Sequence, residues 1–178
     1  MKSLAKILGL ILGVMIIFII HLLVINLFPY PFNHINTVFL CLFWLVIFSG
    51  QTKILWLALP LAFLLELFSP VPFGVITSAL ILSLAIIGWF LFNIFTNHSL
   101  HIIFLSAFLG LLLYRVLFVL ILYILNLFKG GYNLLLPEIL FNIFLEIILT
   151  AGVLTFFYFL TALFMRRLNP AYIRLGKR

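Results

Sequence analysis

Long apolar runs separated by short polar breaks make up almost the whole chain. The runs cover residues 7–28, 35–48, 54–68, 73–95, 100–128 and 137–165. As α-helices rising 1.5 Å per residue, the longer runs can cross about 30 Å of hydrocarbon. The breaks contain Pro, Gly, Asn and Ser, which are typical of turns between antiparallel helices. The pattern predicts an all-α fold, a polytopic helical bundle of about six transmembrane helices in a single domain (residues 1–165) with a basic tail (166–178).

Composition agrees with a membrane environment. Hydrophobic residues make up 67% of the 178 residues and charged residues 7%, and the mean hydropathy is +1.45. A soluble domain is about half apolar and about a quarter charged. In water this chain would expose large apolar patches and aggregate. Membrane lipids are therefore the expected surroundings of the helices.

The second and third runs leave two arrangements open. Runs 35–48 and 54–68 are about fifteen residues each, which is short of the roughly twenty that a spanning helix normally needs. They are separated by the break from Ser49 to Lys53. The turn can dip into the interface while Lys53 reaches out to water, giving two full spans. A re-entrant hairpin is the alternative, and two full spans are the prediction.

Charge distribution predicts the orientation. The formal net charge is +7, and five of the ten basic residues lie in the last thirteen positions. With the N-terminus inside, the cytoplasmic segments would carry those five residues together with Lys2, Lys6 and Lys53. Only Lys129 would then lie outside, while Arg115 falls within the fifth run. The positive-inside rule therefore places both termini in the cytoplasm of a multi-pass protein of the inner (plasma) membrane.

The basic charge does not indicate nucleic-acid binding, because no folded basic surface exists to present it. The N-terminal run follows Lys2 and Lys6 as in a signal peptide, but no small-x-small cleavage site follows it. We expect a retained first helix.

No catalytic motif is visible in the chain. It contains no Asp and three Glu, which excludes intramembrane enzymes that need paired aspartates. Gly-x-Ser-x-Gly, HExxH and Gly-rich phosphate loops are also missing from the sequence. We therefore expect a protein that is not an enzyme and that uses no cofactor.

Histidine and cysteine give no sign of a metal site. His98 and His101 are spaced i, i+3, but a zinc site needs further ligands and none is near in the sequence. We expect these two residues to mark the cytoplasmic edge of the fifth helix. His21 is expected to be a hydrogen-bonded packing residue and Cys41 a small buried hydrophobe.

Three ionisable residues within the apolar runs form the candidate polar cluster: Glu66, Arg115 and Glu146. Charged groups at membrane depth cost several kcal/mol unless they are paired or face water. Helix rise places Glu66 and Arg115 about 20 and 22 Å from the inner side, and Glu146 about 13 Å from the outer side. All three then lie in the outer half of the bilayer, where one or two carboxylates can pair with the guanidinium. The cluster can be a structural ion pair or part of a polar cavity that binds a partner or substrate.

Small residues recur every four positions at the start of the first run, at Ala5, Gly9 and Gly13. This spacing lets another helix approach closely. The neighbouring helix can belong to this chain or to a partner subunit.

The segment from Leu64 to Gly74 resembles the MreD family of rod shape-determining proteins. An acid, Glu66, stands near the end of a short helix, as in the family's Gly-x-x-x-Asp pattern, with Ala62 in the glycine position. The family-like turn and the opening of the next helix contain Ser69, Pro70, Phe73 and Gly74. Length, number of runs, minimal loops and the link at residues 96–100 are also similar to that family.

The resemblance implies a non-catalytic membrane component of the bacterial cell-wall elongation machinery that controls rod cell shape. Its implied partners are an MreC-like scaffold, the actin-like MreB and the peptidoglycan synthases that lengthen the wall. A substrate-binding S component of an energy-coupling-factor vitamin transporter is the alternative. Such proteins also have six helices and dock a partner through small residues on the first helix. They generally need polar external loops, and the loops here are nearly bare.

The predicted topology can be tested with reporter fusions along the chain. Fusions should report outside after Asn33, Val71 and Gly131. They should report inside after Gln51, His98 and Arg178. An external signal at Arg178 would contradict an even number of spans. An external signal at Gln51 would show that the second and third runs form the re-entrant hairpin and not two full spans.

Overall fold

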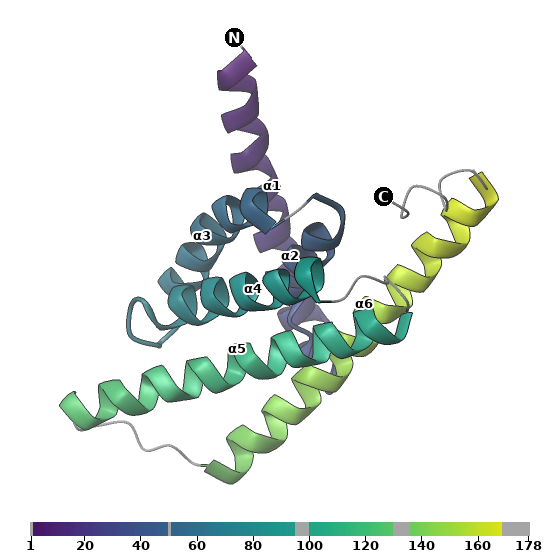
Figure 1. Cartoon of the computed structure of the whole chain (residues 1–178). Coiled ribbons are helices and arrows are strands. Elements are labelled where there is room, and N and C mark those ends of the chain that lie inside the picture. Colours follow the sequence, from purple (N-terminus) through teal and green to yellow (C-terminus); the bar gives the residue numbers. More distant parts are fainter. Residues whose placement is uncertain (1, 50, 95–99, 130–135, 169–178) are drawn as a thin grey trace.

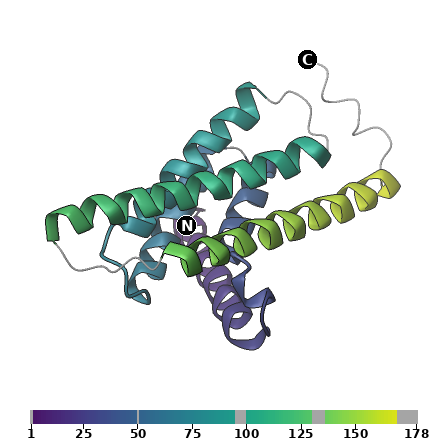
Figure 2. The same cartoon turned by 90° about the horizontal axis from the view of Figure 1, so that it is seen from below.

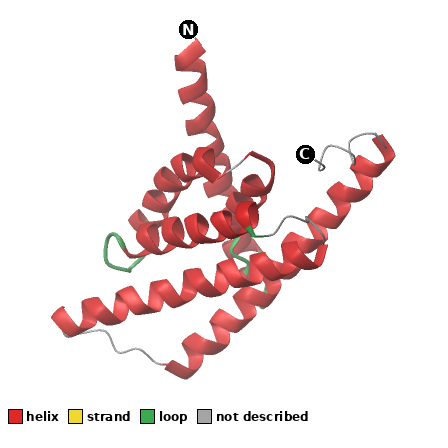
Figure 3. Ribbon diagram, in the orientation of Figure 1, coloured by secondary structure: helices red, strands yellow, loops and turns green. Residues whose placement is uncertain are grey.

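The computed structural model describes residues 2–49, 51–94, 100–129 and 136–168 of the chain (Figure 1). Within these residues the secondary structure is helical, with turns and no strand (Figure 3). The α-helices are α1 (Lys2–Leu27), α2 (Thr37–Ser49), α3 (Gln51–Leu67), α4 (Val75–Asn93), α5 (Leu100–Lys129) and α6 (Leu136–Leu168). A short 3₁₀ turn, η1 (Phe32–His34), precedes α2. The predicted all-α fold is confirmed, and each apolar run corresponds to one helix.

Two expected boundaries were wrong. The break predicted over residues 49–53 is narrower, because α2 ends at Ser49 and α3 already begins at Gln51. Gln, Thr and Lys are tolerated in a first helical turn, so their polarity did not prevent helix formation. At the other end, α6 continues to Leu168 and includes Arg166 and Arg167, which had been assigned to the tail. Arginine is a good helix former and is favourable in the last turn of a helix.

Helix length divides the six helices into two groups. Four helices, α1, α4, α5 and α6, contain segments long and apolar enough to cross a membrane. The described part of the chain therefore belongs to a helical membrane protein. Helices α2 and α3 are apolar but have 13 and 17 residues, or about 20 and 26 Å at 1.5 Å per residue.

The helices pack as a consecutive series with α1 set across it. Helix α3 packs against α4, α4 packs against α5, and α5 packs against α6. Helix α1 packs against α2, α3 and η1, and Figure 1 shows it upright beside the flatter α4 and α5. Its N-terminal part extends beyond the other helices. Seen from below, α5 and α6 lie across the front of the remaining helices (Figure 2).

Burial follows the same arrangement. The core lies where α2, α3, α4 and α5 meet and is filled by fully buried side chains such as Phe39, Leu61, Leu80 and Leu111. Large apolar side chains are exposed on α1, α3, α4, α5 and α6, as expected of a protein whose solvent is lipid, whereas the described side chains of α2 are buried or half-buried. Helix α1 is exposed on most of its surface and buries only Val14 and Phe18 among its described residues.

Helix α5 approaches α2 and α4 closely at Gly110. A Cβ added there would lie 3.0 Å from Phe39 Cζ and 3.3 Å from Ile87 Cγ1. Phe39 is fully buried and lies against the rings of Phe43 and Tyr114, so it has little room to move. The absence of a side chain at Gly110 is what permits this approach.

Gly110→Ala is expected to lower the thermal stability of the protein in detergent. Overpacking of a full core costs about 1–3 kcal/mol, whereas Ala gains roughly 1 kcal/mol over Gly in a helix, so the net effect is destabilising because Phe39 has little room to move. Gly152→Ala is the matched control, because a Cβ at this α6 position meets no atom within 4 Å. Thermal unfolding should give a lower Tm for Gly110→Ala than for Gly152→Ala. Equal Tm values would show that the α2–α5 contact is loose.

Candidate functional site

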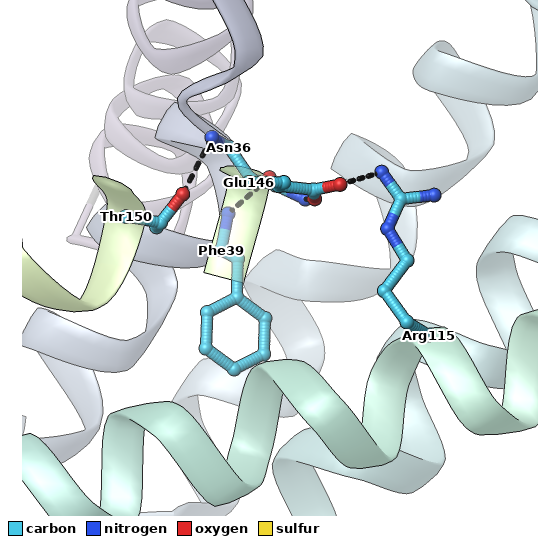
Figure 4. Close-up of polar contacts among 5 residues, drawn as sticks. All are labelled: Asn36, Phe39, Arg115, Glu146 and Thr150. Carbon is cyan, nitrogen blue, oxygen red and sulfur yellow. Dashed lines mark hydrogen bonds and ion pairs between the residues drawn. The ribbon is translucent and has the colours of Figure 1, made fainter. Parts of the chain in front are cut away.

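An ion pair between Arg115 and Glu146 lies inside the helical assembly. Arg115 is in the middle of α5, and its Nη2 donates to Oε2 of Glu146 on α6. Figure 4 shows the arginine side chain extended from α5 toward the carboxylate. The Glu146 side chain is 5% exposed, whereas 25% of the Arg115 side chain stays exposed. The pair therefore holds a nearly buried carboxylate beside a partly accessible guanidinium.

Asn36 joins this ion pair to α2. Its Nδ2 donates to Glu146 Oε1 at 2.8 Å, so both carboxylate oxygens accept a hydrogen bond. Its Oδ1 accepts from the backbone N–H of Phe39 at 2.9 Å. Asn36 immediately precedes α2, and this is the usual geometry of an N-cap, which satisfies one of the free N–H groups of a first turn.

The Asn36 backbone also contacts α6. Its N–H donates to Thr150 Oγ1 at 2.9 Å, one helical turn beyond Glu146 (Figure 4). Thr150 is fully buried. The start of α2 is thus bound to α6 at two points, and one of them is shared with α5. Burying polar groups without such partners would cost free energy at each group.

Of the two carboxylates that could pair with Arg115, Glu146 does so and Glu66 instead serves the start of α4. Its Oε1 accepts from the backbone N–H of Thr77, the third residue of α4, at 2.8 Å. Glu66 is buried near the end of α3, so its carboxylate closes the α3–α4 turn by capping α4. Among the described residues, the ion pair of Arg115 is with Glu146 alone. A carboxylate at a helix N-terminus is favourable because it accepts hydrogen bonds from the free N–H groups and is attracted by the positive end of the helix dipole.

The family-like turn contributes to the same cap. Gly74 precedes α4 with φ of +94°, which an L side chain rarely adopts. Ser69 Oγ accepts from the N–H of Val71 at 3.4 Å, and the Phe73 ring packs edge-on against Phe63 of α3. Pro70 lies directly after Ser69 in this turn, and as a proline it has no backbone N–H that would need a hydrogen-bond partner.

A polar cleft of about 380 Å³ opens beside the ion pair. We call it the Arg115 cleft. It lies between the C-terminal part of α1, the segment before α2, the α3–α4 turn and the middle of α5. Its polar lining residues are His21, Asn33, His34, Asn36, Ser69, Arg115 and Glu146. The remaining lining side chains are apolar or aromatic, including Phe18, Leu22, Ile25, Phe68 and Phe118.

Two aromatic rings flank the guanidinium in this cleft. The Arg115 Cζ lies 5.4 Å from the centroid of Tyr114 and 5.5 Å from that of Phe118. Both distances are within the range of cation–π attraction. On the α1 side, His21 Nδ1 lies 2.7 Å from Thr37 Oγ1. This agrees with the expectation of a hydrogen-bonded histidine.

The two glycines of the small-residue stripe on α1, Gly9 and Gly13, have open space where a side chain would lie. A Cβ at Gly9 or Gly13 would meet nothing within 4 Å. The side chain of Ala5 lies outside the described residues. The spacing therefore brings no described helix against α1 at these two glycines.

The remaining candidates form no site. His98 lies outside the described residues, and His101 is exposed at the start of α5. Cys41 is a free, half-buried cysteine on α2. Across the described residues, no group of three His, Cys, Asp or Glu side chains could hold a metal ion.

Comparison with known proteins adds no assignment. No family model matches the chain, and no curated protein or solved structure matches it either.

Asn36 and Thr150 are the site residues that the sequence analysis missed. Asn36 carries a readable signal, because Asn two residues before the apolar stretch that begins at Val38 is a typical N-cap. Thr150 carries none, since threonine is common on membrane helices and its partner lies 114 residues away.

Removing Arg115 is expected to destabilise the protein strongly. Arg115→Leu leaves the Glu146 carboxylate buried without its cation, which costs roughly 3–5 kcal/mol in soluble proteins. Glu66→Gln should cost less, because the amide oxygen can still accept from Thr77. The measurement is thermal unfolding in detergent, with the double variant Arg115→Leu/Glu146→Leu as control. The double variant should recover part of the loss, and a wild-type Tm for Arg115→Leu would show that the pair contributes nothing.

Proposed function

We propose that this protein is a non-catalytic membrane scaffold of the bacterial cell-wall elongation machinery, similar to the MreD family. In this proposal it resides in the plasma membrane, crosses it six times and has both termini in the cytoplasm. Its partners are an MreC-like scaffold and the elongation peptidoglycan synthases. It acts through helix surfaces and turns over no substrate.

The α3–α4 turn is the observation that carries the proposal. The residues that resemble the family, from Glu66 to Gly74, act together as one structural device. The acid caps the next helix, and the glycine adopts the left-handed conformation that the turn needs. Two of the residues on which the resemblance rests, Glu66 and Gly74, therefore contribute to the same turn geometry.

The surface of α1 supports a scaffolding role. Its N-terminal part extends beyond the other helices (Figure 1), and Gly9 and Gly13 meet no described helix. Small residues on an open membrane helix allow close approach by a helix of another protein. The short α2 and α3 add to this, because a helix shorter than the bilayer favours association with neighbours.

The Arg115 cleft favours a second candidate, the S component of a vitamin transporter. A pocket with a few converging polar groups among apolar side chains is typical of a small-molecule site. A vitamin that remains bound through purification and is lost in Arg115→Gln would favour this candidate.

Depletion of the protein in its native rod-shaped host tests the proposal. Rounded cells are expected, because a missing scaffold would uncouple wall synthesis from elongation. Co-purification with MreC from detergent extracts is the companion assay. Cells that keep their rod shape and show impaired vitamin uptake would overturn the scaffold proposal in favour of the transporter component.

Complementation with α1 variants makes the test specific. Gly13→Leu should weaken co-purification with MreC and restore rod shape poorly, without lowering the Tm. Gly152→Leu is the matched control, because a Cβ at Gly152 likewise meets no atom within 4 Å, but on α6. Full complementation by Gly13→Leu would exclude this face of α1 as the contact surface.

A further inference from the structure

The Arg115 guanidinium has hydrogen-bonding capacity that its described neighbours do not use. A guanidinium carries five N–H donors, and the ion pair with Glu146 takes one of them through Nη2. Nε is buried and has no partner among the described residues. The oxygen Asn33 Oδ1, on another lining residue of the cleft, is likewise buried without one. Buried polar atoms normally have partners, so the unpaired Nε–H donor of Arg115 indicates a missing acceptor in this cleft.

The charge pattern favours an anionic occupant. Glu146 is the carboxylate that lines the cleft, and both of its oxygens already accept hydrogen bonds from Arg115 and Asn36. The positively charged group facing the cleft is the guanidinium, and His21 Nδ1 already lies 2.7 Å from Thr37 Oγ1. Arginine matches the geometry of a phosphate or carboxylate through paired N–H groups.

The rim of the cleft is apolar and faces outward. Leu22 and Ile25 of α1 are 37% and 43% exposed, and Phe68 after α3 is 70% exposed. All three residues also line the cleft. On a membrane protein, such side chains contact acyl chains. A molecule in this cleft can therefore place a charged group at Arg115 and an apolar tail along these three side chains.

We propose that the Arg115 cleft binds the phosphate group of a membrane lipid, with the acyl chains along Leu22, Ile25 and Phe68. The guanidinium is the binding group for the phosphate, and Tyr114 and Phe118 hold its plane in place by the cation–π contacts. Lipid binding is independent of the scaffold role, because it requires neither MreC nor any other protein partner.

The test compares two lipids that differ only in the phosphate. Purified full-length protein in neutral detergent is incubated with phosphatidic acid or with diacylglycerol of the same acyl chains. Native mass spectrometry then counts the bound molecules. Phosphatidic acid should be retained at least about tenfold better, as expected of charge-assisted hydrogen bonds to one group. Equal retention of the two lipids would overturn the proposal.

Two variants distinguish lipid binding from a structural role of the ion pair. Arg115→Gln should abolish the preference for phosphatidic acid. Glu146→Gln removes the competing carboxylate while keeping an oxygen for Asn36, so it should strengthen phosphatidic acid binding. A purely structural pair would weaken binding in both variants, or in neither. Trp56→Ala is the control, because Trp56 is exposed on α3 and does not line the cleft.

Inorganic phosphate separates the lipid from the free ion as the ligand. Phosphate at equal concentration should fail to displace phosphatidic acid, because it cannot use the apolar rim. Displacement by inorganic phosphate would show a site for the free anion and would overturn the lipid proposal. If Arg115→Gln fails to fold, the comparison of the two lipids on the wild type and on Glu146→Gln still decides the question.

Discussion

The Glu146 carboxylate is the point on which three helices depend. It accepts from Arg115 on α5 and from Asn36 at the start of α2, while its own helix, α6, also binds the Asn36 backbone through Thr150. In a lipid environment a polar group has no water to replace a lost partner, so each of these contacts restricts the others. This constraint explains why a chain with 7% charged residues keeps an Arg and a Glu deep among apolar helices.

The same requirement shapes the turn between α3 and α4. The first N–H groups of α4 need acceptors, and the nearly bare turn supplies one through the Glu66 carboxylate. Both acidic side chains of the described core therefore serve helix starts, Glu66 directly and Glu146 through Asn36. The first turns of α2 and α4 thus receive their acceptors from single side chains, Asn36 for α2 and Glu66 for α4.

The Arg115 cleft and the open face of α1 are two surfaces of the described chain through which the protein can act. The Arg115 cleft follows from the ion pair, since the guanidinium that binds Glu146 on one side remains accessible on the other. The open surface follows from the packing of α1, which buries Val14 and Phe18 and leaves Gly9 and Gly13 free. A scaffold that senses lipid at the cleft and holds a partner along α1 would use both. Neither feature requires chemistry on a substrate.

The sequence by itself determined the helices, because apolar run length and turn residues depend on local physics. All six helices and the all-α class were predicted from it. The presence of Arg115, Glu66 and Glu146 also showed that buried polar contacts must exist, since an unpaired charge in lipid is too costly.

The sequence did not determine which carboxylate meets the arginine. Depth along each helix was readable at 1.5 Å per residue, but the rotation of each helix about its axis was not. That rotation depends on long-range packing, such as the approach of α5 to Phe39 at Gly110. Only the tertiary structure therefore directed Glu146 to the guanidinium and Glu66 to the start of α4.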